Sequence, residues 1–349
     1  MFHLLVMACT VGGTCAERWL PQGDNAQIAA CEAGATAVAS PWLAAHSMRG
    51  EGQRCAPTDT LPTLTLAPVA SGVWVHLGAP GTASADNHGE IANSGVVTGP
   101  RGVAVIDPGG TRAEAEALLA AIRRLTPLPV TTVVLTHAHP DHSLGAELFH
   151  EAGAQVIANA ALPASLAARR ATWESGYRET LGEAAWHGSA FIAPDKLLAE
   201  GEAVGFGGDS LDLTPQPPGH SDADLTAWHG ASRTLFTGDL LFRGTTPVLD
   251  GSIIGWLAWL GKAPEPPPDH VVPGHGPVAA GWVEGSAETR SYLEALAQTV
   301  RAAIAEGRSL SEAIPQVVEA MRPLAADLGD FDATTARDAA SAFKELEWE

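Results

Sequence analysis

Apolar residues after position 72 alternate between two spacings, one typical of β-strands and one typical of α-helices. The runs 73–76, 96–97 and 103–107 are short, rich in valine and bounded by turn residues, which favours strands. The next segment opens with Thr111 and Glu114 at the spacing of a capping box, and Leu118, Ile122 and Leu125 then recur at helical intervals. We therefore expect a sheet whose strands lead into a helix at Thr111.

The middle of the chain continues this alternation. Residues 129–135 form a nearly uninterrupted apolar run, as expected of a buried strand in a layered α/β protein. An alanine-rich stretch over 160–187 favours helix, whereas 211–213, 233–236 and 270–272 return to strand character. Residues after 285 favour helix again. The pattern predicts the α/β class.

The N-terminal segment differs from the rest of the chain. Residues 2–8 are apolar and end at Cys9, which predicts a buried strand; a processed signal is the alternative, although no basic stretch precedes the apolar run. Residues 56–63 are rich in proline and threonine, which predicts a linker. We therefore divide the chain into a small cysteine-containing module with its linker at 1–60, a catalytic domain at 61–285, and a helical extension at 286–349 that packs on the catalytic domain.

Composition restricts the partners of this chain. Hydrophobic residues make up 46% of the 349 residues and charged residues 17%, and no apolar run approaches the roughly 20 residues that cross a bilayer. We therefore expect a soluble chain without membrane insertion. The 40 acidic and 20 basic residues give a formal net charge of −20, which disfavours nucleic acid as a partner because phosphates carry the same sign.

All the cysteines of the chain fall within its first 55 residues: Cys9, Cys15, Cys31 and Cys55. An even number of cysteines, in a segment that we expect to be too small to build a core, predicts two disulfides and leaves three pairings open. No Cys-x-x-Cys pair is present, which disfavours a metal site there. Because disulfides form in oxidising compartments, we suspect a periplasmic location, although the sequence has no clear signal peptide.

The segment after the apolar run 129–135 carries the candidate chemistry. His137, His139, Asp141 and His142 offer three imidazoles and one carboxylate within six residues, and zinc prefers such nitrogen and oxygen ligands. Residues 137 and 139 project to the same side of an extended strand end, while a turn through Pro140 can aim Asp141 and His142 at a neighbouring point. One segment can therefore supply ligands to two metal ions.

His-x-His-x-Asp-His after an apolar strand resembles the signature of the metallo-β-lactamase superfamily, and three later motifs follow in that family's order. Residues 218–221 resemble the loop of the second histidine, here His220. Residues 237–239 resemble the segment of the bridging aspartate, Asp239, and residues 273–276 that of the final histidine, His275. The resemblance covers roughly residues 66–285. It implies a four-layer αββα sandwich.

The resemblance also implies three groups of ligands: for one metal ion His137, His139 and His220, for the other Asp141, His142 and His275, and as the bridge Asp239. Asp141 and His142 are therefore also the candidate catalytic residues. Two zinc ions per chain are expected, with iron as the alternative. An aspartate bridge without a cysteine ligand resembles glyoxalase-type thioesterases rather than β-lactamases that use a thiolate.

We therefore expect a zinc-dependent hydrolase that uses a metal-bound hydroxide to cleave an ester, thioester or lactone-like carbonyl in a small acyl substrate. Two alternatives stay open. One is a mononuclear iron enzyme that dioxygenates a persulfide, and the other is a non-catalytic metal-binding accessory protein of a quinoprotein dehydrogenase system. Metal identity and stoichiometry separate the three.

Residues 240–252 follow the expected bridge and predict one rim of the pocket. Arg243 could clamp a substrate carboxylate or form a salt bridge with an acidic residue. Trp256 and Trp259 are three residues apart on a predicted helix, which favours a place in the core. Residues 99–110 and 247–252, together with the cysteine-containing leader, resemble the quinoprotein relay system zinc metallohydrolases. That resemblance implies a quinoprotein dehydrogenase as a candidate partner.

Overall fold

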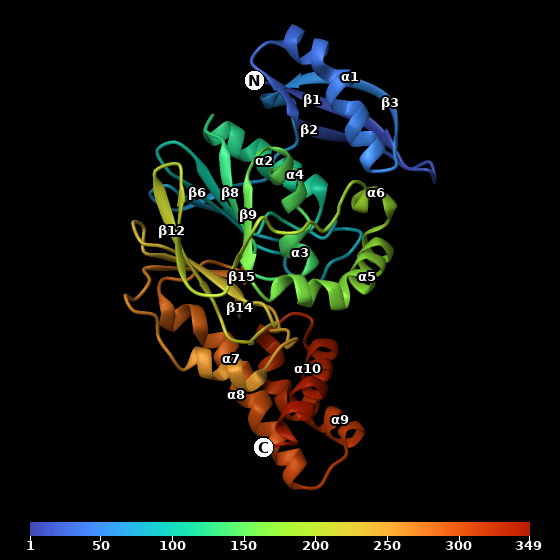
Figure 1. The fold of residues 1–349 in the computed structure, drawn as a ribbon. Coiled ribbons are helices and arrows are strands. Elements are labelled where there is room, and N and C mark those ends of the chain that lie inside the picture. The colour runs from blue at the N-terminus through green and yellow to red at the C-terminus, as the bar shows by residue number, and fades with distance from the viewer.

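A computed structural model describes residues 1–349, the side chain of residue 327 excepted. It contains three sheets, and the N-terminal module and the C-terminal helices lie at opposite ends of the molecule, with the two larger sheets between them (Figure 1). None of the described helices has the combination of length and hydrophobicity that crossing a membrane requires.

The larger sheet has seven strands in the order β10-β9-β8-β7-β6-β5-β4. Strands β7 to β10 pair in parallel, and β4 to β7 pair in antiparallel fashion. The strands are β4 (Ala67–Ala70), β5 (Val73–His76), β6 (Ser94–Thr98), β7 (Val103–Ile106), β8 (Val130–Val134), β9 (Gln155–Asn159) and β10 (Lys196–Leu198). The helices between them are α2 (Arg112–Leu125), α3 (Pro140–Ser143), α4 (Ala146–Glu151), α5 (Leu162–Leu181) and α6 (Glu183–Trp186).

The second sheet has five strands in sequence order, and only its last pair, β14 and β15, is parallel. Its strands are β11 (Glu202–Phe206), β12 (Asp209–Pro215), β13 (Leu225–His229), β14 (Thr234–Phe242) and β15 (His270–His275). The helices that follow are α7 (Ile253–Leu260), α8 (Trp282–Ala305), α9 (Leu310–Met321) and α10 (Phe331–Leu346), with a 3-10 turn η2 (Arg322–Asp327) before α10.

Three apolar clusters hold these layers together. Val97, Ile106 and Val134 of the larger sheet pack against Leu213 and Phe236 of the smaller one, so the two sheets share one core. A second cluster joins the larger sheet to α2 and α4, and a third joins the smaller sheet to α7, α8, α9 and α10. The arrangement is helix, sheet, sheet, helix, which confirms the predicted αββα sandwich of the α/β class.

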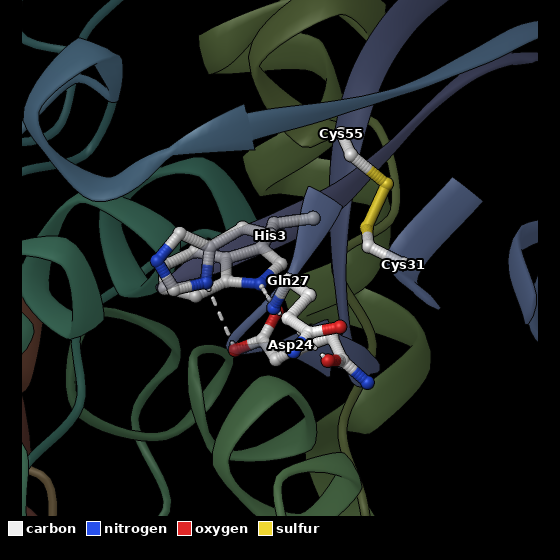
Figure 2. Close-up of a disulfide and its surroundings, with 7 residues drawn as sticks. His3, Asp24, Gln27, Cys31 and Cys55 are labelled. Carbon is white, nitrogen blue, oxygen red and sulfur yellow. Dashed lines mark hydrogen bonds and ion pairs between the residues drawn. A yellow bond between two sulfur atoms is a disulfide. The ribbon is translucent and has the colours of Figure 1, made fainter. Parts of the chain in front are cut away.

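The N-terminal module consists of β1 (Phe2–Cys9), β2 (Cys15–Asn25), α1 (Ile28–Ala45) and β3 (Arg49–Pro57) in a three-stranded sheet ordered β2-β1-β3. Disulfides join Cys9 to Cys15 and Cys31 to Cys55, which confirms the two predicted bridges and settles their pairing. Figure 2 shows the second bridge tying α1 to β3, close to an ion pair between His3 and Asp24.

One expectation for this module is wrong. The segment does build an apolar core of its own, in which α1 lies on the small sheet: Leu4, Val6, Ala8, Leu20, Cys31, Ala35, Ala39 and Trp42. Alanines on one face of α1 let the helix approach the sheet closely, so even a short segment can bury a continuous apolar surface. The disulfides therefore reinforce a core rather than replace one.

The expected linker is more ordered than its composition suggested. Ala56 and Pro57 belong to β3, and Thr58–Thr60 form a 3-10 turn. Arg124 of α2 donates to the carbonyl oxygens of Asp59 and Leu61, which binds this segment to the catalytic part of the chain. The proline and threonine residues mark the end of a strand and a turn, and only the residues after them are irregular. The domain boundaries at 60 and 285 stay our proposal.

A buried charge network joins the N-terminal module to the larger sheet. The Arg112 side chain is 1% exposed and donates to Glu151, Glu116 and the carbonyl oxygen of Trp19. Trp42 of α1 donates to the same Glu151 carboxylate. Since removing one partner of such a network leaves an uncompensated buried charge, these contacts fix the position of the module.

Asp338 of α10 ties this helix to α8 and to the loop that follows β14. Its carboxylate is fully buried and accepts hydrogen bonds from the Leu249 backbone N–H (3.0 Å) and the Tyr292 hydroxyl (2.9 Å). Burial raises the pKa of Asp338 to about 7, even though both hydrogen bonds favour the ionised form.

We predict that Asp338→Asn changes the pH dependence of stability. Because the pKa of Asp338 is raised in the folded state, the wild type loses stability as pH rises from about 4 to about 7. Asparagine at this position does not titrate. The free energy of unfolding of the variant, relative to that of the wild type, should therefore rise by a few kcal/mol across that range, at about 1.4 kcal/mol per pKa unit. Urea unfolding of both proteins at pH 4.5 and pH 8 measures this, and a difference independent of pH would contradict it.

Candidate metal centre

The histidine-rich segment leaves the end of β8 and turns into α3, a single helical turn. Pro140 occupies the first position of that turn, where a proline costs no hydrogen bond. His139 therefore ends the extended part, and Asp141 and His142 lie on the turn. Figure 1 shows α3, β14 and β15 meeting in the middle of the molecule. The two sheets contribute to one site.

The structure brings the predicted ligands together in two adjacent clusters. The first contains His137, His139, His220 and Asp239, and the second contains Asp141, His142 and His275. Within each cluster the potential ligand atoms lie within 4.8 Å of one another. In the first, His220 Nε2 is 3.0 Å from His139 Nδ1. In the second, His275 Nε2 is 3.3 Å from Asp141 Oδ2 and 3.4 Å from His142 Nε2.

Asp239 lies between the clusters, and its two carboxylate oxygens face opposite ways. Oδ2 is 3.7 Å from His137 Nε2 and 3.5 Å from His220 Nε2. Oδ1 is 3.1 Å from His142 Nε2 and 3.4 Å from His275 Nε2. A single carboxylate is therefore shared by the histidines of both clusters.

Two glycines make room for this carboxylate. A Cβ atom at Gly274 would lie 1.9 Å from Asp239 Oδ1. Gly238 has a φ of +52°, and a Cβ there would lie 2.3 Å from Thr136 Oγ1, in the segment that follows β8. A side chain at Gly274 would therefore displace the carboxylate, and one at Gly238 would displace Thr136.

The outer nitrogen of several histidines is held by a partner outside the clusters. His142 Nδ1 is 2.9 Å from Asp107 Oδ2, and His139 Nε2 is 3.0 Å from Asp250 Oδ2. The Nδ1 atoms of His220 and His275 are bonded to the carbonyl oxygens of Val248 (2.7 Å) and Ile91 (2.9 Å). Each of these contacts leaves the other ring nitrogen facing its cluster, as metal-binding histidines require.

The first cluster favours neutral imidazoles. Burial lowers the pKa of His139 to about 4 and that of His220 to about 3, and it lowers the pKa of His137 well below its usual value. A neutral imidazole has a free lone pair, which a cation can bind without displacing a proton.

The second cluster has excess negative charge. Burial alone would lower the pKa of His275, but the carboxylates of Asp239 and Asp141 raise it to about 10. Burial also opposes protonation of His142, yet Asp239, Asp141 and Asp107 raise its pKa well above the usual value. In turn, burial would raise the pKa of Asp239, but the surrounding histidines hold it well below its usual range. Positive charge therefore belongs in this cluster, and a metal ion can replace the protons.

The residues fit metal ions as judged by an unsatisfied buried atom. His137 Nε2 is buried without a hydrogen-bond partner among the described residues. A buried polar atom without a partner costs about 1–3 kcal/mol, so this nitrogen at the centre of the first cluster calls for a ligand. Imidazole nitrogens and carboxylate oxygens are the donor set that zinc accepts. The clusters can therefore hold two metal ions.

A third group with metal-ligand chemistry, His46, Glu147 and Glu151, has a different explanation. The buried guanidinium of Arg112 contacts both glutamates, and His46 Nε2 is 3.3 Å from Glu147 Oε1. The cation that this group needs is already supplied by the protein. We assign it a structural role in the contact between the module and the larger sheet.

A cavity of about 540 Å³ opens over the clusters. Its lining joins the ligands His139, Asp141, Asp239 and His275 to apolar side chains and to α5, the loop after β14, and α10. Trp173 and Tyr177 line it from α5, and Ile91, Phe242 and Val248 line it from the two sheets and their loops. The candidate centre therefore lies at the base of a pocket large enough for an organic substrate.

The structure decides between the two interpretations of Arg243. Its guanidinium donates to the carbonyl oxygens of Pro277 and Val278 and forms an ion pair with Glu284 at 2.8 Å. These contacts favour the salt bridge over the clamp, and Arg243 is not among the residues that line the cavity over the clusters. Trp256 is fully buried and Trp259 packs against the same core, as expected.

Two residues of the site, Arg169 and Asp107, were not among the predicted site residues. Arg169 of α5 lines the cavity and forms an ion pair with Asp250, the residue that holds His139. Asp107 has a φ of +53° at the end of β7, and its carboxylate holds both Thr136 and His142. An Asp-Pro-Gly segment after a strand next to the histidine-rich strand could have indicated Asp107. The position of Arg169 on an alanine-rich helix gives no comparable indication of its role.

Comparison with known proteins agrees with the fold and the site. The sequence model of the metallo-beta-lactamase superfamily matches residues 89–275, and the chain belongs to this superfamily. The solved metallo-beta-lactamase from Pontibacter korlensis superposes with a TM-score of 0.53 at 23% identity, over 66% of this chain and 99% of that one. The sec-alkylsulfatase Pisa1 from Pseudomonas sp. superposes with a TM-score of 0.61 at 16% identity, over 80% and 50%. At these identities the structures support the fold alone.

Two curated relatives match parts of the sequence. An acyl-coenzyme A thioesterase, MBLAC2 of Gallus gallus, is 31% identical over 182 residues, which are 49% of this chain and 62% of the relative. A linear primary-alkylsulfatase of Pseudomonas sp. (strain ATCC 19151) is 25% identical over 244 residues, which are 59% and 46%. The chain spans less than two thirds of the length of either relative.

We predict that Asp250→Ala weakens metal binding at the first cluster. The substitution removes the acceptor of His139 Nε2 and frees that ring to rotate or change tautomer. Loss of such a partner typically costs about 10- to 100-fold in metal affinity. Calorimetric titration of metal-free protein with Zn²⁺ should show one weakened site and one unchanged site. Asp212→Ala, an exposed aspartate on β12, is the matched control, and equal affinities in both variants would refute the role of Asp250.

Proposed function

We propose that the protein is a zinc-dependent hydrolase with two metal ions that cleaves a small acyl substrate, with a thioester as the favoured class over other esters and lactones. The observation that carries this proposal is the buried Asp239 carboxylate, which turns one oxygen to each cluster. A mononuclear site would need only the first cluster. The second cluster is buried and complete as well, so the arrangement favours two ions over the single iron of a persulfide dioxygenase.

Seven residues would hold the ions: His137, His139 and His220 for one, Asp141, His142 and His275 for the other, and Asp239 for both. When bound, two zinc ions acidify a shared water and polarise the carbonyl under attack. The protein itself provides neutral imidazoles and fixed ring orientations at the base of the cavity. The carboxylate of Asp141 lines the cavity and would orient the attacking water.

The pocket walls support an acyl substrate. Trp173, Phe242 and Ile91 present apolar surface next to the ligands and would pack against the acyl group. Burial, together with the nearby Asp141 carboxylate, raises the pKa of Tyr177 well above its usual value. Its hydroxyl therefore stays protonated at neutral pH. Because all four cysteines are in disulfides, a cysteine nucleophile plays no part.

The thioester preference also draws on the relatives. The acyl-coenzyme A thioesterase is the more similar of the two curated relatives described above, and its name specifies a thioester. Zinc as the metal, and a quinoprotein dehydrogenase as a partner of this chain, stay predictions. An accessory protein without catalytic activity would bind metal but turn over no acyl substrate.

We predict that Asp239→Ala lowers the metal content from two ions per chain towards one. The first cluster keeps three neutral imidazoles, whereas the second loses the charge that offsets its cation. Turnover should fall by more than metal binding, and kcat should fall by more than KM rises, because the shared water is no longer positioned. Elemental analysis and thioester kinetics measure both effects. Two tightly bound ions with near-normal kcat in the folded variant would rule out the bridge.

We predict that metal removal abolishes hydrolysis and that Zn²⁺ restores it. A strong chelator should reduce thioester turnover to background, and two equivalents of Zn²⁺ should recover it, because the proposed nucleophile is a water activated by the metal ions. Reconstitution with one equivalent of Fe²⁺, followed by assays of oxygen uptake with a persulfide, tests the alternative. Oxygen uptake without thioester hydrolysis would contradict the hydrolase.

A further inference from the structure

The cavity above the clusters extends to the C-terminal helix α10. Thr334 and Arg337 lie three residues apart on one face of α10 and line the same cavity as His139 and His275. Asp330, at the N-terminal end of the helix, lines it too. In Figure 1, α10 and α5 lie on the same side of the molecule, as expected if they form two walls of one pocket.

The wall formed by α10 is fixed to the loop that follows β14. The Thr246 hydroxyl and backbone N–H both donate to the carbonyl oxygen of Gly329, just before the helix, at 2.7 Å and 3.1 Å. Asp338 accepts from the Leu249 N–H, and Glu345 accepts from the Ser252 hydroxyl at 2.5 Å. These contacts span α10 from its beginning to its last turn. The helix that carries Thr334 and Arg337 is therefore held in place against this loop.

The two arginines of the pocket differ in their partners. The guanidinium of Arg169 is committed to the carboxylate and the carbonyl oxygen of Asp250. Arg337 is exposed, and no ion pair or hydrogen bond holds its guanidinium among the described side chains. In a chain with 40 acidic and 20 basic residues, an arginine with this freedom at the mouth of a pocket is available to a ligand.

The cavity lining combines apolar and polar side chains. The rings of Trp173 and Phe242 lie against those of the ligands His139 and His275, with centroids 5.2 Å and 5.3 Å apart. Helix α10 adds the polar side chains Thr334 and Arg337 to the same cavity. A substrate with its apolar acyl group beside the clusters could therefore place a polar remainder against α10.

We propose that Arg337 determines specificity by binding an anionic group on the thiol half of the substrate. This inference rests on the proposed thioester hydrolysis and deepens it: the substrate class is an acyl thioester whose leaving thiol carries phosphate or carboxylate groups. A guanidinium binds either anion with paired hydrogen bonds. Arg337 acts on binding and orientation and contacts no reacting atom.

The test compares thioesters that share one acyl group and differ in the thiol. Coenzyme A supplies phosphates, glutathione supplies carboxylates, and N-acetylcysteamine supplies no charge. Arg337→Gln should lower kcat/KM about tenfold for the anionic substrate that the wild type prefers, mainly through KM, and leave the neutral thioester unchanged. Comparison of the coenzyme A and glutathione thioesters shows whether Arg337 binds a phosphate or a carboxylate. Arg337→Lys should restore part of the loss, because the charge returns without the fork geometry.

Two further variants sharpen the test. Lys344→Gln removes a positive charge from the same helix outside the cavity lining and should change none of the rates. Asp330→Asn removes a negative charge from the cavity wall and should therefore raise kcat/KM for the anionic substrate severalfold. Asparagine also tolerates the φ of +55° at this position. Equal effects of Arg337→Gln on charged and neutral thioesters, or no effect on either, would overturn the proposal.

Binding measurements separate this proposal from the hydrolase itself. Calorimetry of the metal-loaded protein with free coenzyme A and with glutathione requires no turnover. Binding of one thiol that weakens about tenfold in Arg337→Gln supports the anion site even if no thioester is hydrolysed. The opposite outcome is a wild type that binds neither thiol and hydrolyses charged and neutral thioesters with the same kcat/KM. That result would support the proposed hydrolase and refute the anion site.

Discussion

The position of one buried carboxylate, that of Asp239, governs the rest of the candidate centre. Its side chain is 4% exposed and lies among four histidine rings, with an oxygen turned to each cluster. A buried carboxylate is costly unless positive charge lies next to it. Both clusters can supply that charge by holding a cation. The same carboxylate therefore faces both candidate metal sites, and in the proposed function it would be shared by the two ions.

The sandwich itself produces this arrangement. The larger sheet contributes the segment from His137 to His142, whereas the smaller sheet contributes Asp239 and His275 from adjacent parallel strands, with His220 from the loop before β13. Neither sheet holds a complete set alone. The close approach is possible because Gly238 and Gly274 leave space for the carboxylate and for Thr136, in the segment that follows β8. Packing of the two apolar faces thus assembles the site.

Groups that are close in sequence were predictable from the residues alone, whereas the distant ligands His220, Asp239 and His275 were predicted only through the family resemblance. The strand 129–135 and the histidines after it were visible because hydrophobic period and ligand spacing are local properties. The cap at Thr111 was predictable for the same reason, and its hydroxyl accepts from Glu114 N–H. The Glu114 carboxylate, however, accepts from the backbone N–H of Gly110, the residue before the cap, rather than from that of Thr111.

The pocket walls depend on contacts between distant segments. Arg243 had a suitable place in the sequence, but Glu284 of α8 lies next to it in the fold and engages the guanidinium. Arg337 comes from the C-terminal helix, almost 200 residues after the histidine motif, and no spacing rule links the two. The core of the N-terminal module was missed because alanines on α1 bury apolar surface without an obvious hydrophobic pattern.

The central claim is that one carboxylate joins two metal sites, and anomalous X-ray diffraction from crystals of the zinc-loaded protein tests it most directly. Data collected on both sides of the zinc absorption edge locate each ion independently of the protein atoms. The account predicts two zinc peaks per chain about 3.5–4 Å apart, with one oxygen of Asp239 bound to each. A single peak, or two peaks with Asp239 bound to only one of them, would contradict it.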